Sequence, residues 1–152
     1  MADAVTMNMA MGKIGGIAAL AIAAIGSALG TGTAGMAAIG AWKKCYALGK
    51  PAPFMLLTFV GAPLSQTIYG IVLMFNMQGK IADGMPWQSL VSAGVLAGLG
   101  MGFSAWLQGK AGAAGSDALA ETGEGFTNYL AALGIIETVA IFVMVFVMLA
   151  VK

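Results

Sequence analysis

The fold is decided by residues 126–151, FTNYLAALGIIETVAIFVMVFVMLAV, an apolar stretch that contains one charged residue, Glu137. A hydrocarbon core about 30 Å thick is crossed by roughly 20 apolar residues in a helix, and this stretch is long enough. Residues 14–41, 54–77 and 87–115 also meet this criterion, the last of them free of charge before Lys110. The sequence therefore predicts an all-α membrane protein, with four transmembrane helices in one membrane domain, residues 1–152.

The composition of the chain supports a membrane protein and excludes several other classes. Its 152 residues are 60% hydrophobic and 9% charged, whereas soluble domains carry about 25% charged residues. The absence of histidine, with Cys45 as the single cysteine, rules out His-based catalysis, a thiolate metal cluster and an internal disulfide. A net charge of +1 gives no basic surface for nucleic acid, and no GxxxxGK[ST] phosphate loop is present. We therefore expect a chain that is not an enzyme and does not bind nucleic acid.

The lysines indicate how the helices are oriented. Lys43, Lys44 and Lys50 crowd the first connection, which the positive-inside rule places in the cytoplasm together with the third connection. Because the number of spans is even, both termini lie on the same side of the membrane, which is the outside. The second connection, residues 78–86, lies on that side as well. The N-terminus does not resemble a signal peptide, because Asp3 precedes the nearest lysine and the apolar run is too long. These features predict a multi-pass protein of a bacterial plasma membrane.

The chain is organised as two tandem hairpins in which helices 14–41 and 87–115 are rich in small residues. Small residues at intervals of four let helix backbones approach closely. Such strips are common in membrane bundles, but here two of them lie on alternate helices, which predicts a tight inner layer and an outer layer of bulkier helices. The repeat is parallel, unlike the inverted repeats of many transporters. The strips comprise Gly26, Gly30, Ala34 and Ala38 in the first helix, and Gly94, Gly98 and Gly102 with Ala105, Gly109 and Ala113 in the third.

Glu137 is the one carboxylate within a predicted span, about halfway along the fourth helix. A charge at the bilayer centre costs about 2.5–3.5 kcal/mol on insertion scales, and an intramembrane acid is a functional-site hypothesis by default. The sequence places no Lys or Arg at the same depth in another helix. We therefore expect Glu137 either to be protonated or to bind a mobile cation.

Polar oxygens at a similar depth offer such a cation its ligands. On the second helix, Ala62, Ser65, Gln66 and Tyr69 share one face, and Pro63 can kink the helix and free a carbonyl. Together with Glu137 they suit a small, hard monovalent cation. The alternative is that these groups only hydrogen-bond one another between helices. Further oxygens at this depth belong to Thr67, Ser104, Gln108 and Thr138.

Three segments carry a family resemblance that covers nearly the whole chain. They are PLSQTIYG (residues 63–70), LQGKAGAAG (107–115) and IIETVAIF (135–142), which lie in this order on the second, third and fourth helices. They resemble the proteolipid subunit of V-type ATPases, most closely the K or c-type proteolipid of the bacterial sodium-translocating enzymes. The length and the four-helix plan are also similar.

The resemblance implies a specific ion site. Tyr69 would bond the carboxylate, and Pro63 would support the site by freeing a carbonyl. Ser65 stands where the family usually has Thr and keeps the hydroxyl, while Leu64 is bulkier than the small residue expected there. The Na⁺ ligands that the resemblance implies are Glu137, Gln108, Gln66, Ser65 and the backbone carbonyl of Ala62.

The resemblance also implies the function. Copies of the chain would form a closed ring within the lipid, carry Na⁺ across the membrane as the ring rotates, and meet a stator subunit that supplies an arginine. The cytoplasmic connections would contact the central stalk, and ATP hydrolysis would take place on other subunits. Transport of H⁺ by the same rotor is the alternative. A small four-helix cation or drug exporter and a membrane-organising protein are further alternatives, but such exporters place their glutamate in an early helix among aromatic residues.

Overall fold

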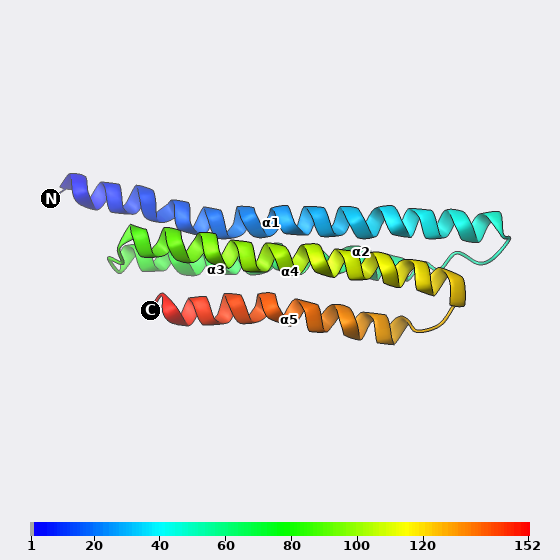
Figure 1. The fold of residues 1–152 in the computed structure, drawn as a ribbon. Helices are drawn as coiled ribbons and strands as arrows, with labels where there is room; N and C mark the ends of the chain where they lie inside the picture. Colours follow the sequence, from blue (N-terminus) through cyan, green and yellow to red (C-terminus); the bar gives the residue numbers. More distant parts are fainter. Residues whose placement is uncertain (1) are drawn as a thin grey trace.

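The computed structural model describes residues 2–152, which form helices and no strand. The helices lie side by side along one direction, and both labelled ends of the chain are at the same end of the bundle (Figure 1). Four helical segments are long and apolar enough to cross a membrane. The predicted all-α membrane fold is thus confirmed. The elements are α1 (Ala2–Ala47), α2 (Leu56–Gly61), η1 (Ala62–Leu64), α3 (Ser65–Ala82), α4 (Trp87–Thr122) and α5 (Phe126–Ala150).

Three of the four helical segments extend beyond the predicted spans. Helix α1 has 46 residues and passes Lys13 and Lys43, where the span 14–41 was expected to end. A lysine marks the limit of the stretch that lipid can cover, but the helix continues past it because lysine is a good helix former. The helices end instead near residues in the left-handed region, where glycine is favoured. These are Gly49 (φ 64°), Gly84 (φ 83°) and Gly123 (φ 73°).

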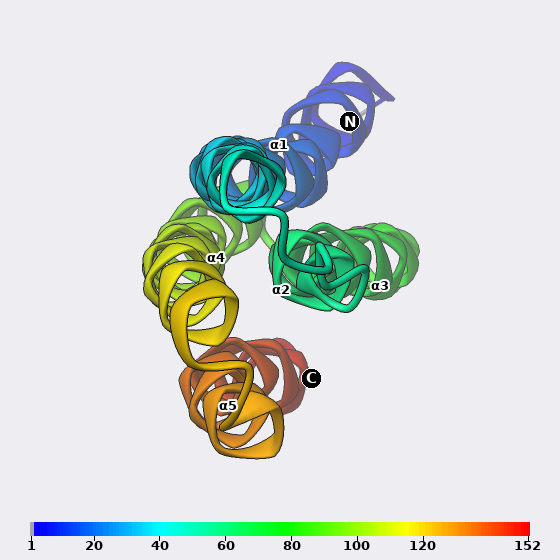
Figure 2. The ribbon, with the colours of Figure 1, turned by 90° about the vertical axis from the view of Figure 1, so that its right-hand side faces the viewer.

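The closest helix packing is between α1 and α4. A Cβ atom built on Gly94 would lie 1.9 Å from the Gly15 carbonyl oxygen, and one built on Gly109 would lie 2.2 Å from Gly30 Cα. Viewed end-on, α1 and α4 are neighbours, α2 and α3 lie on one flank of this pair, and α5 lies beyond α4 (Figure 2). The predicted close approach of the two small-residue helices is therefore confirmed within the chain.

Helix α5 is the least covered of the four segments. Within the chain, 11% of its most apolar window is buried, against 44% for α4. Its large exposed side chains recur at intervals of three and four, so they form one stripe that suits lipid or a neighbouring chain. The stripe comprises Ile135, Val139, Phe142, Phe146 and Leu149.

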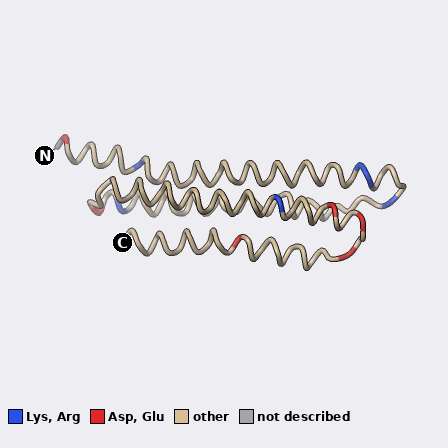
Figure 3. Tube along the Cα trace, in the orientation of Figure 1, with Lys and Arg blue, Asp and Glu red and all other residues tan. Residues whose placement is uncertain are grey.

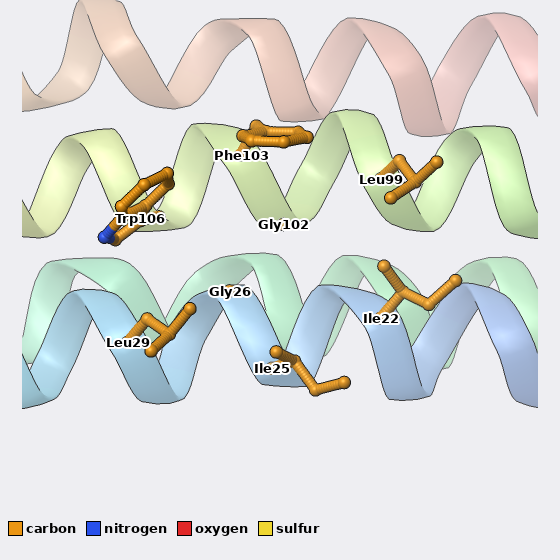
Figure 4. A pocket seen from close by; sticks show the side chains of 8 residues that line it. All are labelled: Ile22, Ile25, Gly26, Leu29, Leu99, Gly102, Phe103 and Trp106. Atoms are coloured by element: carbon orange, nitrogen blue, oxygen red, sulfur yellow. The ribbon is translucent and has the colours of Figure 1, made fainter.

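An apolar groove of about 130 Å³ lies between α1 and α4 (Figure 4). Gly26 and Gly102 form its floor where the two backbones approach. None of the side chains around it is ionisable, so this groove offers nothing to hold a cation. It is lined by Ile22, Ile25, Gly26, Leu29, Leu99, Gly102, Phe103 and Trp106.

Asn8 joins the start of α1 to the connection between α3 and α4. Its Nδ2 donates to the Met85 carbonyl oxygen (3.1 Å), and its Oδ1 accepts from the Trp87 backbone N–H (2.9 Å). Trp87 is the first residue of α4. The N-cap residue before it, Pro86, makes no side-chain hydrogen bond that caps the helix. Asn8 therefore satisfies a free N–H of the first turn of α4 from another helix.

We expect Asn8→Ala to loosen this connection, because both hydrogen bonds are lost. An N-cap bond contributes about 1 kcal/mol, so amide hydrogen exchange over residues 83–90 should be faster by roughly fivefold to thirtyfold. The matched variant Asn8→Asp keeps the acceptor for Trp87 and should show a smaller increase. An unchanged exchange rate in Asn8→Ala would contradict a role for Asn8 in holding the connection.

Candidate ion-binding site

The site begins at a break in the second membrane segment. Pro63 has no backbone N–H, so the helix cannot continue its normal hydrogen bonding there, and residues Ala62–Leu64 form a 3₁₀ turn. Helix α3 starts immediately after the turn, at Ser65. The break that the sequence predicted at Pro63 is confirmed, and it places Ala62 and Ser65 at one end of α3.

The carboxylate of Glu137 is held by hydrogen bonds from two other helices. The Tyr69 hydroxyl of α3 donates to Glu137 Oε1 at 2.5 Å, and Gln108 Nε2 of α4 donates to Oε2 at 3.2 Å. Glu137 itself is half-buried on α5. Each carboxylate oxygen thus accepts a hydrogen bond from a different helix, which fixes the Glu137 side chain between α3 and α4.

A chain of hydrogen bonds continues from Gln108 to the 3₁₀ turn. Gln66 Nε2 donates to Gln108 Oε1 at 2.8 Å, and both glutamine side chains are fully buried. The Ser65 hydroxyl lies within hydrogen-bonding distance of two acceptors, Gln66 Oε1 (3.2 Å) and the Ala62 carbonyl oxygen (3.0 Å). The structure therefore brings together the site residues that the sequence singled out, from Ala62 to Glu137.

Two further bonds fix α5 against α4 around the carboxylate. Ser104 donates to the Ile136 carbonyl oxygen at 2.9 Å, and Gln108 Nε2 also donates to the Leu133 carbonyl oxygen at 3.0 Å. From the sequence Ser104 was only one of several oxygens at this depth. Its spacing of four residues from Gln108 places it on the same face of α4 and was the available signal.

Two neighbouring residues turn away from the site. Thr138 is exposed and donates to the Ile135 carbonyl oxygen of its own helix. Leu64 is 53% exposed, so its side chain lies on the surface, and its bulk relative to the family pattern does not narrow the site.

The depth of Lys110 corrects one expectation from the sequence. Lys110 is two residues from Gln108, or about 3 Å along α4, so a lysine does lie close to the depth of Glu137. Its Nζ lies 4.2 Å from the centre of the Trp106 ring, and neither of the ion pairs among residues 2–152 includes Lys110 or Glu137. In Figure 3 most other charged segments are near the ends of helices. The described lysines thus leave Glu137 without a fixed cation.

One comparison with known proteins bears on this site. Residues 91–150, which contain most of α4 and all of α5, match the family model for the C subunit of ATP synthase. No curated protein matches the chain. The matched segment includes Ser104, Gln108 and Glu137, so the second hairpin is similar to the C subunit of ATP synthase over the part of the chain that supplies these three residues.

Proposed function

We propose that the chain is a rotor-ring subunit of a V-type ATPase that carries Na⁺ on Glu137. It would move the ion as the ring rotates, while ATP hydrolysis takes place on other subunits. One observation carries the proposal most strongly. The only acid in the membrane part of α5 is held by donors from α3 and α4, without a lysine, in a hairpin that is similar to the C subunit of ATP synthase.

The mechanism follows from the cost of a bare carboxylate. When a cation is bound, Glu137 is neutralised and its half-buried site can face lipid, whereas an empty ionised site cannot do so cheaply. An empty site must meet a compensating charge, which we assign to an arginine of a stator subunit. Copies in a closed head-to-tail ring would pass this stator in turn. Each charge that crosses 100 mV is worth about 2.3 kcal/mol, which rotation must supply.

The number of carboxylates per chain supports a V-type assignment. Between Lys13 and Lys43 helix α1 has no charge, and residues 54–77 have none. The first hairpin therefore offers no second ion site, and one chain would carry one ion on four helices. This is the pattern implied by the resemblance to fused V-type proteolipids.

The set of oxygens favours Na⁺ over H⁺. Besides the carboxylate, Gln66 Oε1, the Ser65 hydroxyl and the Ala62 carbonyl are already linked to one another, and they are hard ligands suited to sodium. A proton needs fewer oxygens. Gln108 presents nitrogen to Glu137, so its Oε1 could become a ligand only if the amide rotated. In the proton alternative the glutamines would accept from a protonated Glu137, and Gln108 would have to rotate its amide in the same way to do so.

The end of the bundle at the first and third connections suits contact with the central stalk. At this end of the bundle, Lys44 near the end of α1 forms an ion pair with Glu121 near the end of α4, so the two helix ends are joined. We propose that this end is cytoplasmic, that the termini face outward, and that the ring lies in a bacterial plasma membrane.

The test is carbodiimide labelling of the assembled complex with and without sodium. The reagent attacks protonated carboxyls, so bound Na⁺ should protect Glu137, whereas potassium should not. The variant Tyr69→Phe loses the bond to the carboxylate and should need roughly tenfold to a hundredfold more sodium for half protection, since a bond to a charged group is worth about 1.5–3 kcal/mol. The ring should remain assembled in this variant.

Two outcomes would count against parts of the proposal. If sodium has no effect while labelling still falls as pH rises, the transported ion is H⁺. If the purified chain does not form a ring, the exporter alternative is favoured over a rotor.

A further inference from the structure

Helix α1 supplies none of the site residues, but it contains a buried polar side chain, Ser27. This residue is 2% exposed, and its hydroxyl oxygen has no hydrogen-bond partner in residues 2–152. Serine and threonine in a helix commonly donate to a carbonyl of the preceding turn. Ser27 does not make this bond, so its buried oxygen calls for a partner on another helix. The bond to the preceding turn is made by Thr31, Thr33, Ser92 and Ser116.

Two close contacts show which stretches of α1 and of the second membrane segment face each other. A Cβ atom built on Gly70 would lie 3.3 Å from Ala23 Cβ, and one built on Gly30 would lie 2.8 Å from Pro63 Cβ. The two helical segments run in opposite directions (Figure 1). The stretches between these two contacts therefore pack against each other.

Within these stretches Ser27 and Gln66 lie at the same level. Ser27 is four residues from Ala23 on α1, and Gln66 is four residues from Gly70 on α3, so equal steps lead from one contact to both side chains. Both side chains are buried. The Gln66 amide has two N–H groups, and one of them donates to Gln108 Oε1, which leaves the other for a second acceptor. The Ser27 oxygen is an acceptor at the level where this amide lies.

Binding of a cation would change the partner of Gln66. Gln108 presents Nε2 to Glu137, so its Oε1 reaches a cation only if the amide rotates. After this rotation Nε2 of Gln108 would face Nε2 of Gln66, and two donors cannot bond each other. Because a buried N–H without an acceptor is costly, Gln66 would need another buried acceptor.

We infer that Ser27 is a positioning residue that accepts a hydrogen bond from Gln66 Nε2 in the sodium-loaded site. This inference rests on the proposed function. The Ser27 hydroxyl can at the same time donate to the Ala23 carbonyl, so the hydroxyl hydrogen also has a partner. With Nε2 held by α1, the Gln66 Oε1 stays on the side of Ser65, where the proposed ligands are. Ser27 would thus raise the affinity for the ion without touching it.

The test is carbodiimide labelling of Glu137 in the assembled complex with Ser27→Ala, at varied sodium concentrations. Alanine favours a helix and removes only the hydroxyl, so the ring should assemble. The sodium concentration for half protection should rise roughly twofold to tenfold, the range expected for one neutral hydrogen bond. The matched control is Ser116→Ala, a fully buried serine of α4 whose hydroxyl bonds its own helix, and it should not change the sodium requirement. An unchanged requirement in Ser27→Ala would overturn the inference.

A second measurement separates positioning from a general distortion of the site. Without sodium, labelling reports the protonation of Glu137, whose hydrogen bonds come from Tyr69 and Gln108. In Ser27→Ala, labelling without sodium should therefore fall at a pH within about 0.3 units of wild type. A shift of this pH together with the sodium requirement would show a distorted site and overturn the inference.

The outcomes also separate this inference from the proposed function. If sodium protects Glu137 equally in wild type and in Ser27→Ala, the inference alone fails. If sodium does not protect wild-type Glu137, the sodium proposal fails, and the inference fails with it.

Discussion

Glu137→Gln is expected to abolish ion transport while the ring still assembles. The substitution keeps the size of the side chain and can still accept from the Tyr69 hydroxyl, so the contacts of α5 with α3 and α4 are largely kept. It removes the negative charge, and without that charge the site neither neutralises a cation nor needs a stator to refill it. We expect transport to fall below detection, a loss of at least about a thousandfold.

The measurement is sodium uptake by vesicles that contain the complete complex, with ring assembly followed by electrophoresis. Asp3→Asn is the matched control, because it removes a carboxylate at the exposed start of α1, and it should transport normally. Glu137→Asp keeps the charge but shortens the reach to Tyr69, so its transport should be intermediate. Pumping at a measurable rate by Glu137→Gln would remove the central claim.

Gly109→Ala is expected to impair assembly of the ring strongly. The added Cβ would lie 2.2 Å from both Cα and the carbonyl oxygen of Gly30, and backbone atoms cannot move away as a flexible side chain can. Helices α1 and α4 would have to separate along their contact. Overpacking commonly costs about 1–3 kcal/mol, and a clash with backbone should reach or exceed the upper end of this range.

Thermal stability of the purified chain in detergent and the yield of rings test this expectation. Gly79→Ala is the control, because a Cβ there meets nothing within 4 Å and alanine favours a helix by about 1 kcal/mol. This variant should be as stable as wild type or more stable. Equal stability of Gly109→Ala and Gly79→Ala would show that the close approach of α1 and α4 contributes little.

The residues of the candidate site could be predicted because a carboxylate without partners in a membrane span has a high free energy. A carboxylate in an apolar stretch requires partners, and the spacing of Ala62, Ser65, Gln66 and Tyr69 places them on one face of a helix, where the structure has them. The glycine spacing likewise predicted which two helices pack most closely.

Other features depend on geometry between helices that spacing along one helix does not encode. The depth of Lys110 became clear only from the bond of Gln108 to Glu137, which sets the relative height of α4 and α5. Asn8 lay outside the span expected to begin at residue 14, since a hydrophobicity criterion finds the part of a helix that lipid covers. Its bonds to Met85 and Trp87 join segments far apart in the sequence.

The contrast between the unbroken helices and the 3₁₀ turn has a mechanical consequence. Helix α1, at 46 residues or about 69 Å, and helix α4 contain no proline and are joined at one end by Lys44 and Glu121. In a rotor driven from that end, this pair would behave as a stiff shaft. The helix that carries Ser65 is interrupted at Ala62–Leu64, so elastic bending under load would concentrate there. Under the proposed function, torque would thereby act on the turn that presents the Ala62 oxygen and would couple load to the affinity for the proposed ion.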